Sequence, residues 1–435
     1  MSAIEARSSG AADGIEGWMT RARAWLDDLQ TPTGLRASSA TGRYDALFGR
    51  DSLWSILLAL EAARLRPEDG ELARWSARLA ERSLRALAET QGARRNDDTE
   101  EQPGKIVHEY WPEPPERLTQ NNWPLDGEGR YYGSVDGTYL FLMAATTVWE
   151  QVAGGRELVE SLWDHVLAAL RWALEDGDPD GDGLMEAWPR QPLGLGLTNQ
   201  VWKDSGDALI LRDGSLPEPP VAWVELQGYA IAAYRGMREV LRARGEDTAL
   251  QDELARRATR IEERLDRFWL PGESCPAMAL TRQKTPVPLV SSNMGHLLWC
   301  GALNGQWAAS TASRLLRPDL LTAWGIRTLS AQAYAFDPNS YHRGSVWPFD
   351  NAIAAGALWR MGRREDACEI GRRVIAALER FDNPVELYCV LPPSWVRAPD
   401  VNGSAVLVDY RSASAVQAWS AAGLLLFGAQ LLVAG

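Results

Sequence analysis

The sequence predicts an all-α fold in which paired helices form an (α/α)6 toroid. Helical periodicity and capping signals mark about twelve segments along the 435 residues. The segments alternate in character, because some carry one apolar face, as 70–91 does, whereas 51–66 and 346–361 are apolar nearly all round. Such alternation indicates an inner ring of buried helices wrapped by an outer ring. We expect the helices near 15–30, 51–66, 70–91, 136–153, 157–175, 222–244, 247–269, 292–302, 305–316, 346–361, 364–381 and 413–433.

An α-solenoid is the alternative all-helical architecture. A solenoid should show a fixed sequence period of about 34–47 residues, and this sequence has no such period. Length alone suggests two or three domains, but a toroid makes residues 15–435 a single domain. Residues 1–14 are small and polar and are expected to form a flexible N-terminus.

Composition excludes several classes of partner. The net charge of −13 and the pI near 5.0 argue against binding to nucleic acid or to anionic membranes. The apolar run 421–434 is shorter than the roughly 20 residues that span a bilayer, so it predicts a buried helix. Four scattered cysteines and the lack of a secretion signal favour a reducing, cytoplasmic location. The sequence leaves the oligomeric state open.

The segment Trp202–Asp207 combines an indole, a cation and two carboxylates in a glycine-rich region. A carboxylate between a tryptophan and a glycine is placed to lose water and to shift its pKa. A glycosidase needs this combination, because a flat apolar surface supports the sugar ring and an acid protonates the leaving oxygen. The alternative is a structural loop in which Trp202 belongs to the core and Asp204 and Asp207 cap helices.

Other polar and aromatic motifs also precede the even-numbered, buried segments. In a toroid these connections meet at one mouth, near helix N-termini whose dipoles favour carboxylates. A pocket lined by Asp, Glu, Trp, Tyr, His and Arg predicts a carbohydrate site, and the high content of 20 tryptophans fits it. The connections are 48–52, 131–136, 197–208 with 223–229, 292–296, 340–350 and 383–417.

Eight motifs give the chain a family resemblance. In order they read Phe-Gly-Arg-Asp-Ser, Tyr-Tyr-Gly-Ser-Val-Asp, Asn-Gln-Val-Trp-Lys-Asp-Ser, Gly-His-Leu-Leu-Trp, Gly-Ile-Arg-Thr-Leu-Ser, Ser-Tyr-His-Arg-Gly-Ser-Val-Trp-Pro, Val-Glu-Leu-Tyr-Cys and Gln-Ala-Trp. From about residue 40 to 425 the chain resembles the amylo-α-1,6-glucosidase domain of glycogen-debranching-type proteins. Related (α/α)6 hydrolases are processing α-glucosidase, glucosylglycerate hydrolase and mannosylglycerate hydrolase. The resemblance implies an inverting, exo-acting glycosidase that releases a terminal α-linked sugar, with glucose expected.

Carried over residue by residue, the resemblance makes Asp204 the general acid and Glu386 the general base. Inverting hydrolysis needs two carboxyl groups about 6.5–9.5 Å apart, which connections from two inner helices can supply. Without the resemblance, Glu386 is equally an N-terminal cap or a surface residue, and Glu225 or Asp350 are the next candidates for the base. Asp51 beside Arg50 is expected to bind sugar hydroxyls, or to cap its helix, or both. The expected substrate-binding residues are Arg50, Asp51, Tyr110, Trp111, Asp136, Trp202, Lys203, Asp207, Gln227, His342, Trp347, Asp350 and Trp419.

The acid and base roles demand different protonation states. Trp202 should desolvate Asp204 and raise its pKa, whereas Glu386 must stay ionised to activate water. We therefore expect the Lys203 ammonium to turn away from Asp204, towards Asp207 or a substrate hydroxyl.

Two departures from the family bear on the substrate. Bacterial relatives often carry a β-rich domain before the toroid, which this sequence lacks, and the motif 409–417 differs from the usual Pro/Cys-containing one. A small glycoside such as glucosylglycerate or mannosylglycerate is therefore an alternative substrate. A non-catalytic carbohydrate-binding toroid is the alternative from another class of protein.

The segment Asp178–Glu186 resembles an EF-hand loop in part. Carboxylates occupy positions 1, 3 and 5 and a glycine occupies position 6, but position 12 is Pro189. Either the loop binds Ca²⁺, or it is an acidic turn that presents Glu186 and Trp188 to the pocket; we expect the second. No metal and no organic cofactor are expected for the reaction, because two carboxyl groups complete its chemistry.

Overall fold

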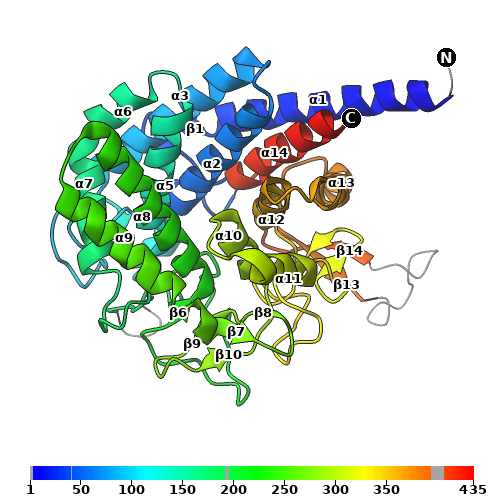
Figure 1. Cartoon of the computed structure of the whole chain (residues 1–435). Helices are drawn as coiled ribbons and strands as arrows, with labels where there is room; N and C mark the ends of the chain where they lie inside the picture. Colours follow the sequence, from blue (N-terminus) through cyan, green and yellow to red (C-terminus); the bar gives the residue numbers. More distant parts are fainter. Residues whose placement is uncertain (1–2, 41, 192–194, 393–405) are drawn as a thin grey trace.

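The helices of the computed structural model form two concentric rings (Figure 1). The structure describes residues 3–40, 42–191, 195–392 and 406–435. Within this part, each inner helix packs against the next, and the last packs against the first, so the ring is closed. The inner helices are α2 (Gly49–Leu65), α5 (Asp136–Gln151), α8 (Val224–Arg244), α10 (Asn293–Trp299), α12 (Pro348–Arg360) and α14 (Ala418–Ala434).

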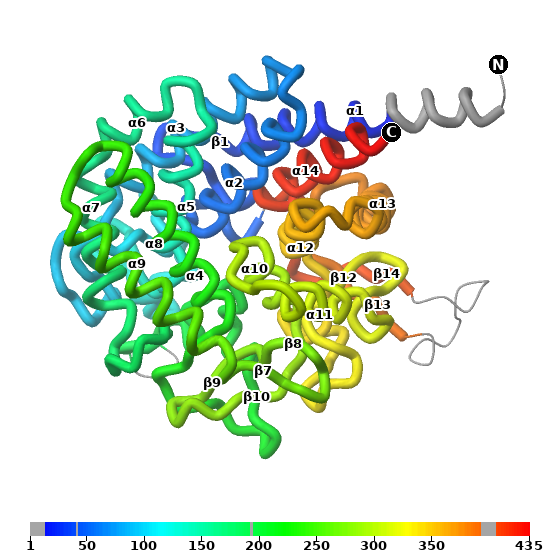
Figure 2. The backbone as a smooth tube through the Cα atoms, viewed as in Figure 1, coloured from blue at the N-terminus to red at the C-terminus, as the bar shows by residue number. Residues whose placement is uncertain are grey.

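The outer helices each cover one inner helix, and the two ends of the chain close the ring. Helix α1 packs on α14, so the first and last helices lie side by side (Figure 2). The others pack on α2, α5, α8, α10 and α12 in turn. The outer helices are α1 (Ala3–Asp28), α3 (Gly70–Glu89), α6 (Gly155–Ser161) with α7 (Trp163–Glu175), α9 (Thr248–Glu262), α11 (Gly305–Leu315) and α13 (Arg364–Phe381).

This is the predicted (α/α)6 toroid, with the even-numbered predicted segments inside. Two outer segments differ in detail. The segment 157–175 is divided by Leu162, whose backbone is not helical, and 247–269 ends as an α-helix at Glu262 and continues as the 3-10 helix η1 (Leu265–Phe268). The short helix α4 (Glu116–Gln120) was not predicted.

Burial explains which helices lie inside. Helix α14 is buried from Ala418 to Gln430, as predicted for the apolar C-terminal run. Helix α3 instead buries one stripe that includes Leu72, Trp75, Leu79 and Leu84, which is the amphipathic pattern of an outer helix. No described helix combines the length and apolarity that a bilayer crossing requires.

Short antiparallel strands lie in the connections that lead into the inner helices. Strand β3 runs directly into α2 and β6 directly into α8, so these pairings fix the backbone where the polar motifs begin. The sheets are β1 (Gln30–Thr31) with β2 (Gly34–Leu35); β3 (Leu47–Phe48), β4 (Glu109–Tyr110) and β5 (Arg130–Tyr131); β6 (Ala222–Trp223), β9 (Ala279–Leu280) and β10 (Pro286–Val287); β7 (Trp269–Leu270) with β8 (Cys275–Pro276); β11 (Leu321–Thr322) with β12 (Gly325–Ile326); and β13 (Tyr388–Leu391) with β14 (Val406–Asp409).

The predicted domain boundary at residue 14 falls inside α1, which begins at Ala3. Residues 1–2 lie outside the described residues, as do 393–405 within the predicted connection 383–417. The division into a flexible N-terminus and one domain stays a prediction.

Close packing between inner helices depends on glycine. A methyl group at Gly356 of α12 would collide with the Trp299 ring of α10, whereas one at Gly17 of α1 would meet no atom within 4 Å. We expect Gly356→Ala to lower the free energy of unfolding by about 1–3 kcal/mol through overpacking. Gly17→Ala is the control and should raise it by up to about 1 kcal/mol, because alanine favours the helix. Chemical denaturation measures both, and equal stability of the two variants would contradict the packing argument.

Candidate active site

A cavity of about 180 Å³ lies where the connections to α2, α5, α8, α12 and α14 meet. Four carboxyl groups and one guanidinium line it, and aromatic rings form most of the remaining wall. The lining residues are Tyr44, Phe48, Arg50, Asp51, His108, Glu109, Trp123, Leu197, Trp202, Asp204, Tyr341, His342, Trp347, Glu386, Gln417 and Trp419.

Two of the larger cavities have fewer buried carboxyl groups in their walls. One of about 790 Å³ lies at the C-terminal ends of inner helices, and its buried carboxylate, Glu61, is neutralised by Arg64 and Arg360. Another, of about 1090 Å³, lies beside β13 and β14. We place the candidate site in the smaller cavity because several buried carboxyl groups converge there.

Arg50 connects three parts of the site. It lies in the first turn of α2 and donates Nε and Nη2 to the two carboxylate oxygens of Asp136, at 2.6 and 3.2 Å. Asp136, in the first turn of α5, is fully buried. This two-point contact fixes the guanidinium plane and directs Nη1 to Asp204 Oδ2, at 3.0 Å.

Asp204 combines partial exposure with a raised pKa. Its side chain is 23% exposed, so it can meet a ligand in the cavity. Burial raises the pKa of Asp204 to about 6, although the positive charge of Arg50 opposes the rise. The direction is the one that the sequence predicts.

Trp202 belongs to the base of the site. Its ring is buried and stacks on His296 with centroids 5.5 Å apart and planes 12° from parallel. His296 Nε2 lies 2.8 Å from Asp350 Oδ1, and Tyr229 OH lies 2.5 Å from Nδ1. We assign the ring proton to Nε2, which leaves Nδ1 to accept from Tyr229. The indole therefore lines the cavity and is also part of the core, so the two alternatives for Trp202 coexist.

Glu386 lies just before β13 and is buried. The backbone N–H of Ser414 donates to its Oε2 at 2.8 Å, and the Tyr341 hydroxyl donates to its Oε1. The Tyr341 oxygen also lies 3.1 Å from the Tyr44 hydroxyl. Burial raises the pKa of Glu386 to about 7 against the effect of these hydrogen bonds. Its ionised form is therefore less favoured than the sequence argument assumed.

Asp51 and Glu109 are the other two carboxyl groups. Gln417 donates to Asp51 Oδ1 at 2.8 Å, and burial raises the pKa of Asp51 to about 8. The N-cap of α2 is Phe48, and no side chain caps that helix, so the capping alternative for Asp51 is wrong. Trp111 and Trp123 donate their indole N–H groups to Glu109, and burial raises the pKa of Glu109 to about 7.

The structure brings together eight of the predicted site residues. The lining of the cavity contains Arg50, Asp51, Trp202, Asp204, His342, Trp347, Glu386 and Trp419. It does not contain Tyr110, Trp111, Asp136, Lys203, Asp207, Gln227 or Asp350, nor Glu225, which the sequence offers with Asp350 as an alternative general base.

Several of the residues outside the lining support the ones within it. Asp136, Trp111 and Asp350 hold Arg50, Glu109 and His296 respectively. Gln227 instead bonds the backbone of Met185.

Lys203 and Asp207 have partners other than those predicted. The Lys203 ammonium donates to the Thr328 carbonyl at 2.6 Å and to Ser292 Oγ at 3.3 Å, not to Asp207. Asp207 is paired with Arg343 at 3.0 Å. A buried ammonium group needs oxygen partners, and the Thr328 carbonyl and the Ser292 hydroxyl provide them.

Sequence reasoning missed eight lining residues for two reasons. Phe48, Tyr341 and Gln417 lie inside recognised motifs but were not singled out, and Leu197 only borders one. Tyr44, His108, Glu109 and Trp123 belong to connections without a recognisable pattern. The β3–β4 pairing sets Phe48 opposite Glu109 and brings that connection to the cavity, which no local signal reveals.

The acidic loop does not reach the cavity. Glu186 was expected to face the pocket with Trp188, but it bonds Lys284, and the Arg190 guanidinium covers the Trp188 ring at 4.7 Å. Neither residue lines the site. The attraction between the loop's carboxylates and Lys284 explains this orientation.

Comparisons with known proteins identify a family and several solved structures of similar fold. Residues 70–387 match a family described as the mannosylglycerate hydrolase MGH1-like glycoside hydrolase domain. No curated protein matches the sequence significantly. The GH63 mannosylglycerate hydrolase from Thermus thermophilus, in complex with Tris and D-glycerate, matches with a TM-score of 0.67 at 16% identity, over 94% of this chain and 99% of that one. A glycosidase variant in complex with glucose matches with a TM-score of 0.62 at 12% identity, over 98% and 99% of the two chains. At these identities the structural matches establish the fold.

Proposed function

Because this chain belongs to the mannosylglycerate hydrolase MGH1-like glycoside hydrolase family, we propose that it is an inverting, exo-acting enzyme that releases one terminal α-linked glucose from a short glycoside. One observation carries the proposal: Asp204 and Glu386, from separate connections, line the same small cavity. The volume of about 180 Å³ is below the roughly 300–1,000 Å³ of pockets for drug-sized ligands. This size favours a single sugar unit over a long polymer.

In this mechanism Asp204 is the general acid and Glu386 is the general base. The raised pKa of Asp204 increases the fraction of this group that carries a proton near neutral pH, and that form donates the proton to the glycosidic oxygen. Glu386 takes a proton from water, which attacks the opposite face of the sugar in a single step. The contacts from Ser414 and Tyr341 hold its carboxylate in place.

His342 and Trp347 are proposed to bind the sugar. The backbone N–H of Ser205 donates to His342 Nδ1 at 3.3 Å, and the Ser205 Oγ lies 2.9 Å from the same nitrogen. Burial holds the pKa of His342 well below its ordinary value. A neutral ring that accepts at Nδ1 carries its proton on Nε2. That N–H is a donor for a sugar hydroxyl, and stacking on Trp347 at 5.1 Å keeps the ring oriented.

A second candidate substrate is glucosylglycerate or mannosylglycerate. The small cavity favours it, and the similar Thermus thermophilus hydrolase has been crystallised with D-glycerate. We also propose a cytoplasmic location, supported by four cysteines that are all free thiols.

Asp204→Asn should lower kcat/KM by at least about 10²-fold, because it removes the proton donor. The assay is monosaccharide release from a panel of α-linked disaccharides and glycosylglycerates. Asp213→Asn is the control and should keep full activity, since Asp213 is exposed and its hydrogen bonds among the described residues go to Ser215. If the unmodified protein binds members of the panel but releases no sugar from any, the chain is a carbohydrate-binding toroid instead.

The first product released from an α-linked substrate should be the β-anomer. A direct attack by water inverts the anomeric carbon, whereas a covalent intermediate would retain its configuration. Proton NMR within the first turnovers distinguishes the two anomers before mutarotation. Initial formation of the α-anomer would rule out the single-step mechanism while leaving a glycosidase in place.

The pH dependence of kcat/KM should be a bell with its maximum between about 6 and about 7. Activity falls at low pH as Glu386 gains a proton and at high pH as Asp204 loses one. The charge of Asp204 raises the pKa of Glu386, so the two groups titrate together and the two measured values belong to the pair. Glu386→Gln should remove the acid limb from any residual activity. A near-normal rate with an unchanged bell would assign the base to another residue.

A further inference from the structure

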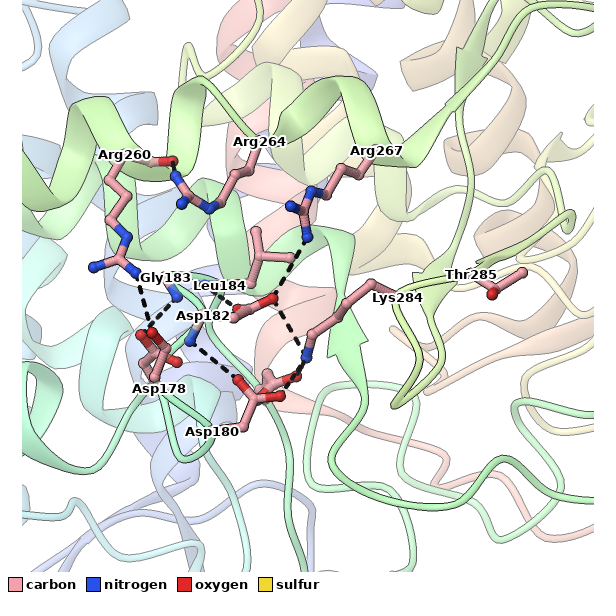
Figure 3. A network of polar contacts seen from close by, with 12 residues as sticks. Asp178, Asp180, Asp182, Gly183, Leu184, Arg260, Arg264, Arg267, Lys284 and Thr285 are labelled. Carbon is pink, nitrogen blue, oxygen red and sulfur yellow. Dashed lines mark hydrogen bonds and ion pairs between the residues drawn. The ribbon is translucent and has the colours of Figure 1, made fainter.

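The loop after α7 gathers four carboxylates beside the hairpin that joins β9 to β10 (Figure 3). Asp178, Asp180 and Asp182 occupy alternate positions and Glu186 follows. Backbone N–H groups of Gly183 and Leu184 bond one oxygen of Asp178 and of Asp182, at 2.8 and 2.9 Å. The loop is thus folded as a cation-binding turn would be, with carboxylate oxygens gathered on one side.

Three of these carboxylates lie close together. One ligand atom each from Asp178, Asp180 and Glu186 lies within 4.8 Å of the others. The Glu186 side chain is fully buried. Hard divalent cations bind such sets of oxygens, and Ca²⁺ accepts six to eight of them in flexible geometry.

An ammonium group from another element already lies among these oxygens. Lys284, in the β9–β10 hairpin, places Nζ 2.7 Å from Asp180 Oδ2, donates to Glu186 Oε1 and lies 3.7 Å from Asp182 Oδ2. Its side chain is only 13% exposed. The backbone at Lys284 has a φ of +58°, a conformation rare for residues with a side chain, so the turn holds this residue at a conformational cost.

One ammonium does not satisfy the whole set of oxygens. Within the described part of the chain, no hydrogen-bond partner reaches three of the buried oxygens, which are Asp178 Oδ1, Asp182 Oδ2 and Glu186 Oε2. Among the neighbouring arginines, Arg267 reaches only 3.7 Å from Asp182, and Arg260 bonds the Gly181 carbonyl instead. Two of these unpartnered oxygens, on Asp178 and Glu186, belong to carboxylates of the cluster that could hold a metal ion.

We propose that the Lys284 ammonium replaces a divalent cation in this loop, and that the loop becomes a Ca²⁺ site when the ammonium is removed. The replacement has a structural purpose. Glu186 is followed by the Ala187–Val221 bridge, and Lys284 belongs to the hairpin that pairs with β6. The ion pair between Lys284 and Glu186 therefore stabilises the start of the connection that contains Asp204.

The test compares Lys284→Met with Arg282→Met, a control that removes an exposed cation from the same hairpin. Melting temperatures are measured in EDTA, CaCl₂ and MgCl₂, and Ca²⁺ binding is measured by calorimetry. We expect EDTA, CaCl₂ and MgCl₂ to leave the melting temperature of the unmodified protein unchanged, and likewise that of Arg282→Met. Lys284→Met should melt lower in EDTA and recover with increasing Ca²⁺, less so with Mg²⁺, which demands stricter geometry. Adding Asp180→Asn to Lys284→Met should weaken the recovery.

Two results would overturn the proposal. A rise in the melting temperature of the unmodified protein with Ca²⁺ would mean that the ion displaces Lys284. A Lys284→Met protein that is equally unstable, or equally unfolded, in Ca²⁺ and in EDTA would mean that the oxygens form no metal site. Both readouts concern stability and binding, so they do not depend on the proposed activity.

Discussion

The contact of Arg50 with Asp136 and Asp204 is the constraint on which the site depends. It joins the first turns of two inner helices to the connection before a third. A guanidinium buried at this depth is tolerated only because both acidic partners are present, and removing one partner of a buried pair typically costs about 3–5 kcal/mol. The closed ring supplies the rigidity, since α2 and α5 pack directly against each other. The closed ring of inner helices therefore also sets the position of Asp204.

Burial decides how the carboxyl groups of the cavity behave. Asp51, Glu109, Asp204 and Glu386 all have raised pKa values, because aromatic walls and inner helices remove water from them. Each group is held by its own donors, so the four are not interchangeable. Of these four groups, Asp204 is the one that bonds the Arg50 guanidinium, whose positive charge opposes the rise of its pKa. Protons can therefore be held on some groups and released from others at neutral pH.

The fold was almost wholly predictable from the sequence, whereas the site was predictable in part. Each predicted helical segment matches a helix, because the 3.6-residue period of apolar side chains is a pattern of neighbouring residues that can be recognised in the sequence. The break at Leu162 carried no such signal. In the site, residues within motifs on the inner-helix connections reached the cavity, as Arg50 and His342 do. Residues such as Gln227 and Lys203 share those motifs but point into the core, because a connection has two sides and the sequence does not say which one faces the cavity.

By itself the sequence determined the toroid, the end of the ring at which polar residues collect, and the residue types that meet there. Only the tertiary structure decided that Glu109 and Tyr44 join the cavity, that Asp136 serves Arg50, and that Lys284 pairs with the acidic loop. The physical reason is range. Helix periodicity depends on residues that are close together in the sequence. The ion pairs of Arg50 with Asp136 and of Lys284 with Glu186 instead join positions about a hundred residues apart, which only the closed ring brings within a few ångströms.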